Sequence, residues 1–161
     1  AVAEAVRVLR EKGIQTALVD AGGDLYAMGK IDGELWKVGI KHPKGDGVIA
    51  GIELTDLAVV TSGDYERCFE EDGVRYHHLL NPRTGQPARG LCSVTVFSRD
   101  AVLADAWSTA LFIMGPEAAL KCANEVVEIE AVLVTDEGAV MTSTGLAGAI
   151  EIERLPSKQE K

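Results

Sequence analysis

The sequence contains little cysteine, and what it has is scattered. The three cysteines, Cys68, Cys92 and Cys122, are far apart in the chain and form no Cys-x-x-Cys pair. An odd and sparse set excludes a disulfide framework and offers no cysteine spacing of a structural metal site. We therefore interpret all three as free thiols, buried or half-buried in the fold.

Long apolar runs are also missing. No stretch approaches the roughly 20 apolar residues that a membrane-spanning helix needs. No signal peptide is present either, but the chain begins at Ala1, without methionine and inside the pattern of an amphipathic helix. We expect the native N-terminus, together with any targeting signal, to lie upstream of Ala1.

Positive charge is in the minority. The 16 lysines and arginines stand against 25 aspartates and glutamates, which gives a net charge of −9 and a pI near 4.8. An acidic surface repels phosphate backbones, so the composition argues against a nucleic-acid-binding protein. A small anionic ligand would need a cation, backbone N–H groups or a bound metal at its site.

Apolar material for a core is present. Hydrophobic residues make up 47% of the 161 residues, which fits one domain or a large piece of one. Apolar periodicity predicts helices over residues 2–12, 101–114 and 117–125, the second of them capped by Asp100. Alternation and β-branched runs predict strands at residues 14–19, 25–29, 35–40, 48–54, 57–61, 93–98, 131–135, 139–142 and 149–153.

Tight turns carry several of the polar residues. Asp-Gly pairs predict two hairpins, one that joins strands 25–29 and 35–40 and one around Asp72 and Gly73. Asp20-Ala-Gly-Gly-Asp24 fits either a plain hairpin turn or a site that another group approaches closely. Thr61-Ser-Gly-Asp64 ends a strand in hydroxyls, which can line a site but more often form a turn. The residues alone leave these alternatives open.

Two adjacent histidines lie beyond the second hairpin turn. His77 and His78 are on a predicted strand, and Asn81-Pro-Arg-Thr-Gly85 comes after them as a stiff turn. Because side chains alternate along a strand, we expect at most one of the two histidines in any given site. A structural role and a proton-transfer role are equally open for the pair.

The helix over residues 101–114 holds the other candidate group. Asp105 and Thr109 are four residues apart and share one face, and with Ser108 they are the only polar side chains in an otherwise apolar helix. A carboxylate buried in such a helix should be paired or hold a cation. Carboxylate and hydroxyl oxygens suit Mg²⁺, although two ligands do not complete a site.

Four motifs together resemble one family. They are Val19-Asp-Ala-Gly-Gly-Asp24, Val60-Thr-Ser-Gly-Asp-Tyr65, Tyr76-His-His-Leu-Leu-Asn-Pro-Arg-Thr-Gly85 with Pro87-Ala88, and Ala104-Asp-Ala-Trp-Ser-Thr-Ala110. In order and spacing they resemble the FAD:protein FMN transferases, also called the ApbE or thiamine-biosynthesis-lipoprotein family. The resemblance covers about residues 1–152.

The resemblance implies a fold and an activity. The fold is α+β, with antiparallel sheets flanked by helices, and is related to the tunnelling fold. Residues 1–155 would form the C-terminal portion of such a domain, and residues 156–161 a disordered tail. The activity is a Mg²⁺-dependent transfer that cleaves the diphosphate of FAD, releases AMP and joins FMN to a Thr or Ser hydroxyl of a target flavoprotein.

The resemblance also implies residue roles. His78 would be the catalytic base that takes the proton of the acceptor hydroxyl. Asp105 and Thr109 would bind Mg²⁺, with Ser108 beside them, and Leu79 would border the flavin. The rest of the site would be shaped by Gly22, Gly23 and Asp24.

One departure from the family is large. Members of the family carry a long N-terminal portion that supplies much of the FAD pocket and further metal ligands. The sequence resembles only the C-terminal portion, so we expect the other half of the site to lie upstream or on a separate chain. We expect the chain to be inactive alone. The family also implies a bacterial inner-membrane lipoprotein that faces the periplasm, with its anchor upstream of Ala1.

Two other functions remain open. A Mg²⁺-dependent FAD pyrophosphatase would use the same metal and phosphate chemistry, with water in place of the acceptor hydroxyl. A non-catalytic flavin-binding module would keep the fold without turnover. The presence together of His78, Asp105 and Thr109 argues against the second of these.

Overall fold

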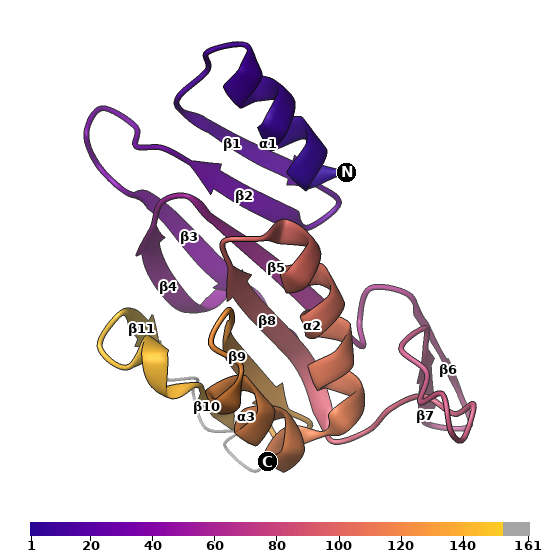
Figure 1. The fold of residues 1–161 in the computed structure, drawn as a ribbon. Helices are drawn as coiled ribbons and strands as arrows, with labels where there is room; N and C mark the ends of the chain where they lie inside the picture. The colour runs from indigo at the N-terminus through magenta and orange to yellow at the C-terminus, as the bar shows by residue number, and fades with distance from the viewer. Residues whose placement is uncertain (153–161) are drawn as a thin grey trace.

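The computed structural model describes residues 1–152, and its elements confirm an α+β fold (Figure 1). The helices are α1 (Val2–Glu11), α2 (Ala101–Met114) and α3 (Pro116–Glu125), with a short 3₁₀ helix at Thr144–Leu146. The strands are β1 (Ala17–Ala21), β2 (Asp24–Met28), β3 (Trp36–Lys41), β4 (Val48–Leu54), β5 (Leu57–Gly63), β6 (Cys68–Glu71), β7 (Val74–His77), β8 (Leu91–Ser98), β9 (Glu130–Thr135), β10 (Val140–Thr142) and β11 (Ile150–Ile152). The tail predicted at residues 156–161 lies outside the described residues.

A six-stranded antiparallel sheet organises the molecule. Its strand order is β1-β2-β5-β8-β9-β10, and the central strand β8 is buried along its whole length. Figure 1 shows the helices on one face of this sheet, with α2 lying across β5 and β8. A second sheet, in the order β11-β4-β3, packs against the opposite face. The hairpin of β6 and β7 projects from one side.

Alternation along β5 fixes which side chains meet α2. Ala58 and Val60 belong to the core between the sheet and the helices, whereas Val59 belongs to the core between the two sheets. We call these the helix-side core and the sheet-side core. The same alternation puts Ser62 on the helix side and Thr61 on the other side. The end of β5 therefore presents a hydroxyl to α2.

The hairpin predicted between residues 25–29 and 35–40 is wrong. The tight turn exists, with positive φ at Asp32 (52°) and Gly33 (88°) and a bridge between Ile31 and Glu34. The flanking strands, however, separate into different sheets: β2 pairs with β1 and β5, and β3 pairs with β4. An Asp-Gly pair specifies a chain reversal, but it does not choose the partner of either strand.

Other expected elements differ less. The first strand begins at Ala17 rather than Ile14, which is exposed in the preceding loop. The hairpin around Asp72 and Gly73 is confirmed, with β6 and β7 in register on either side of it. The cap of α2 is confirmed too, because the Asp100 carboxylate accepts a hydrogen bond from the Val102 N–H at 2.8 Å. No helix within residues 1–152 is long and apolar enough to span a bilayer.

Candidate active site

Helix α2 turns one face to the sheet and leaves the other uncovered. Ala104, Ser108 and Leu111 recur at helical spacing and are fully buried against the sheet. Val102 points away from the sheet and is 63% exposed, whereas Asp105 lies at the edge of the buried face, one turn before Thr109, and is exposed as well. The expectation that Asp105 is buried is therefore wrong for residues 1–152, because no residue in that range covers its side chain.

A cluster of hydroxyls ties α2 to the end of β5. The Ser62 Oγ lies 2.8 Å from the Ser108 Oγ and 3.2 Å from the Thr109 Oγ1. The Ser108 hydroxyl also donates a hydrogen bond of 2.9 Å to the backbone carbonyl of Asp105. Thr109 is half-buried and borders the exposed turn that carries Asp105. The two serines thus contact the Thr109 hydroxyl and the backbone of Asp105.

Asp24 faces the same turn of α2. It begins β2 on the helix side of the sheet, two positions from the buried Tyr26. Burial raises the pKa of the Asp24 carboxyl above its ordinary value, and the nearby charge of Asp105 raises it further. Two carboxylates that repel each other in this way would both be stabilised by a shared cation.

The glycine pair before Asp24 forms the tip of the β1–β2 hairpin. Gly22 and Gly23 have φ values of 74° and 100°, which a side chain rarely adopts, and the Gly23 N–H donates to the Asp20 carboxylate at 3.0 Å. A Cβ on either glycine would meet no atom of the described chain within 4 Å. Within residues 1–152 this is a plain hairpin turn whose outer side is open.

The two histidines take opposite roles, as alternation predicts. His77 is 6% exposed, its Nε2 lies 3.0 Å from the Ala88 carbonyl oxygen, and its ring meets the edge of Phe112 on α2 at 5.6 Å between centroids. Burial lowers the pKa of His77, although the Ala88 carbonyl and the charge of Asp64 oppose the shift. His77 is a neutral anchor, and the exposed histidine is His78.

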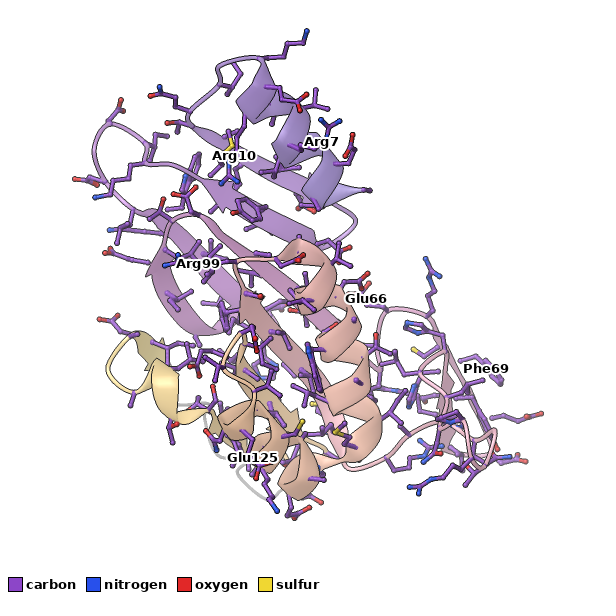
Figure 2. The ribbon with its side chains drawn as sticks, in the orientation of Figure 1. Arg7, Arg10, Glu66, Phe69, Arg99 and Glu125 are labelled. Atoms are coloured by element: carbon purple, nitrogen blue, oxygen red, sulfur yellow. The ribbon has the colours of Figure 1, made fainter. Side chains whose placement is uncertain are left out.

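His78 lies in a hollow on the β6–β7 hairpin. Its backbone N–H donates to the Arg67 carbonyl at 3.2 Å, which fixes the chain where it leaves β7. Figure 2 shows Phe69 on this hairpin, well apart from Arg7 and Arg10 on α1. The cavity holds about 470 Å³ and is lined by Arg67, Cys68, Phe69, Tyr76, His77 and His78. His78 and the α2 cluster are thus on separate elements, joined through the contact of His77 with Phe112.

Leu79 is placed differently from the other predicted site residues. It is 5% exposed and packs in the helix-side core, and its carbonyl accepts a hydrogen bond from the Ala88 N–H at 2.9 Å. Within the described residues it is a core residue, and its contact with a flavin stays a prediction.

Sequence reasoning missed the group that holds the hairpin. The Asp64 carboxylate, 13% exposed, pairs with Arg75 at 3.3 Å. The other Asp64 oxygen and the Nδ1 of His77 are buried and have no hydrogen-bond partner within residues 1–152. The sequence contained a signal for this contact. Arg75 and His77 are two positions apart on β7 and share one face, and Asp64 comes directly after the end of β5.

The donors on α2 fit Mg²⁺ by chemistry but do not surround it. Asp105 supplies a carboxylate and Thr109 a hydroxyl, the oxygen ligands that this ion prefers. No group of three or more His, Cys, Asp or Glu residues within residues 1–152 could hold a metal ion by itself. The described chain therefore offers two oxygen donors of the kind that Mg²⁺ prefers, but no complete set of ligands.

Fold and site define a class: an α+β protein with an oxygen-donor site where a helix crosses an antiparallel sheet. The chain belongs to the ApbE family, whose model matches residues 1–133. The resemblance inferred from the four motifs is thereby confirmed.

Curated relatives and solved structures agree with this assignment. The FAD:protein FMN transferase of Treponema pallidum is 36% identical over 91% of this chain and 44% of its own length, and that of Klebsiella pneumoniae is 37% identical over 89% and 45%. The crystal structure of the Thermotoga maritima ApbE protein has a TM-score of 0.86 and 40% identity, over 92% of this chain and 49% of that one. The flavin transferase ApbE of Vibrio cholerae has a TM-score of 0.80 and 31% identity, over 92% of this chain and 48% of that one. The chain spans about half the length of the relatives it matches.

Proposed function

We propose that the chain forms part of the active site of a Mg²⁺-dependent FAD:protein FMN transferase. The observation that carries the proposal is the placement of Asp105 and Thr109 on an exposed turn of α2, facing Asp24, in a member of the ApbE family. Mg²⁺ held by Asp105 and Thr109 would neutralise the diphosphate of FAD, which the acidic surface of the chain otherwise repels.

His78 would act on the acceptor. Its exposed imidazole takes the proton of a Thr or Ser hydroxyl of the target flavoprotein. The hydroxyl oxygen then bonds to the phosphorus on the FMN side of the diphosphate. The bond from that phosphorus to the bridging oxygen breaks, and AMP leaves with the bonding electrons. The neighbouring His77, buried and hydrogen-bonded to Ala88, holds the hairpin and takes no proton.

The remaining parts of the site would come from residues outside this sequence, in the same chain or a separate one. Asp105 and Thr109 leave most of the coordination shell of Mg²⁺ unfilled. We therefore expect the 161-residue chain alone to transfer no FMN, and transfer by it in FAD and Mg²⁺ would contradict this point. A periplasmic, lipid-anchored location belongs to the same proposal.

Mass spectrometry of the acceptor tests the function directly. Full-length protein, FAD, Mg²⁺ and a candidate flavoprotein should give an acceptor heavier by one FMN minus water, together with AMP. Asp105→Ala and His78→Ala should each abolish the product, whereas His42→Ala, which changes a histidine in the β3–β4 loop, should not. An unmodified acceptor in the wild-type reaction would overturn the proposal.

A pyrophosphatase is the second candidate. Because His78 is exposed in an open hollow, water reaches it as readily as a hydroxyl does. The same reaction without an acceptor separates the two functions: a pyrophosphatase releases FMN and AMP at an undiminished rate, and a transferase requires the acceptor for rapid AMP release.

A further inference from the structure

The strongest unassigned feature is the run of hydroxyls between β5 and α2. Ser62 contacts both Ser108 and Thr109, at 2.8 Å and 3.2 Å, from a strand that is distant from the helix in sequence. Ser108 is fully buried, so its hydroxyl has no access to water. Each hydroxyl carries one proton to donate, and this limit decides the direction of every bond in the cluster.

Only one arrangement of the three hydroxyl protons makes all three contacts hydrogen bonds at once. Ser108 gives its proton to the Asp105 carbonyl at 2.9 Å, so in its contact with Ser62 it accepts. Ser62 therefore gives its only proton to Ser108. In the contact between Ser62 and Thr109, the donor is then Thr109. In this arrangement the protons run in one direction, from Thr109 to Ser62, from Ser62 to Ser108, and from Ser108 to the α2 backbone.

This order matters for Thr109 because a hydroxyl binds a cation through a lone pair. With its proton directed at Ser62, the Thr109 Oγ1 has its lone pairs free for a cation beside Asp105. We propose that Ser62 is a positioning residue for the metal site, which sets the orientation of the Thr109 hydroxyl without touching the metal. The inference rests on the proposed function, since it assigns Asp105 and Thr109 to a cation.

Direct cation binding to the full-length protein tests the inference without turnover. Mn²⁺ titration, followed by electron paramagnetic resonance in the absence of FAD, gives a Kd for each variant. Ser62→Ala should raise the Kd by about 10-fold or more, the usual effect of losing an outer partner of a metal ligand. Ser62→Thr keeps the hydroxyl and should bind Mn²⁺ within about threefold of wild type.

Thr61 provides a matched control on the same strand. Its Oγ1 lies 2.8 Å from the Thr95 Oγ1, on the sheet-side face, so Thr61→Val also removes a hydroxyl–hydroxyl contact of β5. It should leave the Kd for Mn²⁺ unchanged. Ser108→Ala tests the order of the protons: Ser62 loses its acceptor and turns its proton toward Thr109, which should weaken Mn²⁺ binding although Ser108 is buried.

The outcomes separate the two proposals. Wild-type Kd values in both Ser62→Ala and Ser108→Ala, with binding lost in Asp105→Ala, would overturn the role of Ser62 and leave the metal site standing. If Asp105→Ala binds Mn²⁺ as tightly as wild type does, the proposed metal site is wrong, and so is the role of Ser62. Equal weakening in Thr61→Val and Ser62→Ala would show that β5 acts through stability alone, which also overturns the inference.

Discussion

At the scale of single residues, neighbouring histidines differ because of what surrounds them. His78 is exposed beside the hairpin hollow, whereas His77 is enclosed by Ala88 and Phe112. Adjacent positions on a strand point to opposite faces, so alternation predicted this division but not which histidine lies inside, and only the family resemblance favoured His78 for the site. That choice depends on α2, which is far along the chain and packs over only one face.

The lowered pKa of His77 makes stability depend on pH in one direction. Below about pH 6.5, His77 is protonated in the unfolded chain but stays neutral in the folded chain until the pH reaches its lower folded-state pKa. Stability is therefore full above that pH and falls as the pH decreases toward the lower pKa of the folded protein. His77→Gln, which can still donate to Ala88, should lose less stability than wild type between pH 7 and pH 5.5.

Urea unfolding at a series of pH values measures this difference. His42→Gln serves as the control, since it removes a histidine from the β3–β4 loop and leaves His77 in place. If His77→Gln and wild type lose stability in parallel as the pH falls, the buried His77 is not the titrating group.

At the scale of elements, local sequence signals predicted turns and helix caps well, but predicted poorly which strands pair and which elements pack together. The Asp100 cap and the turn at Asp72 and Gly73 depend on residues close in sequence, and both are present. The pairing of β2 with β5 and the contact of Ser62 with α2 depend on register across the sheet. No short stretch of the sequence determines that register, which is why the predicted hairpin between β2 and β3 was wrong.

The β6–β7 hairpin should depend on Arg75, which pairs with the exposed Glu70 on the hairpin itself and with Asp64 beyond the end of β5. Arg75 is the counter-charge of Asp64, whose carboxylate is 13% exposed and whose Oδ1 has no partner within residues 1–152. Arg75→Ala would leave that carboxylate unpaired, at a cost of about 1–2 kcal/mol in unfolding free energy. It should also make the chain more sensitive to proteases near Asp72, where the hairpin turns.

Arg7 gives the comparison for this variant. It pairs with Glu4 and Glu11 on the exposed face of α1, where solvent screens the charges, so Arg7→Ala should change stability little. Equal effects of the two substitutions, measured by denaturant unfolding and limited proteolysis, would show that the hairpin is held by other contacts.

At the scale of the whole molecule, one sheet separates two cores. The helix-side core includes Phe112 and Leu133, and the sheet-side core includes Ile49 and Val134. Leu133 and Val134 are neighbours on β9, so this strand serves both cores at once. Because both cores pack on the same sheet, disruption of that sheet would expose both of them. We therefore expect residues 1–152 to unfold as one cooperative unit.

The two tryptophans can test that expectation, because one reports on each core. Trp107 packs against the helix-side core from α2, and Trp36 packs against the sheet-side core, with its indole N–H 3.3 Å from the Met28 carbonyl oxygen. In the 161-residue chain, Trp36→Phe and Trp107→Phe each leave a single tryptophan. Each variant should show one urea transition whose midpoint agrees with that from circular dichroism of the same variant. A fluorescence midpoint that departs from circular dichroism in either variant would mean that one core opens first, and that the site between β5 and α2 can be lost while the second sheet stays folded.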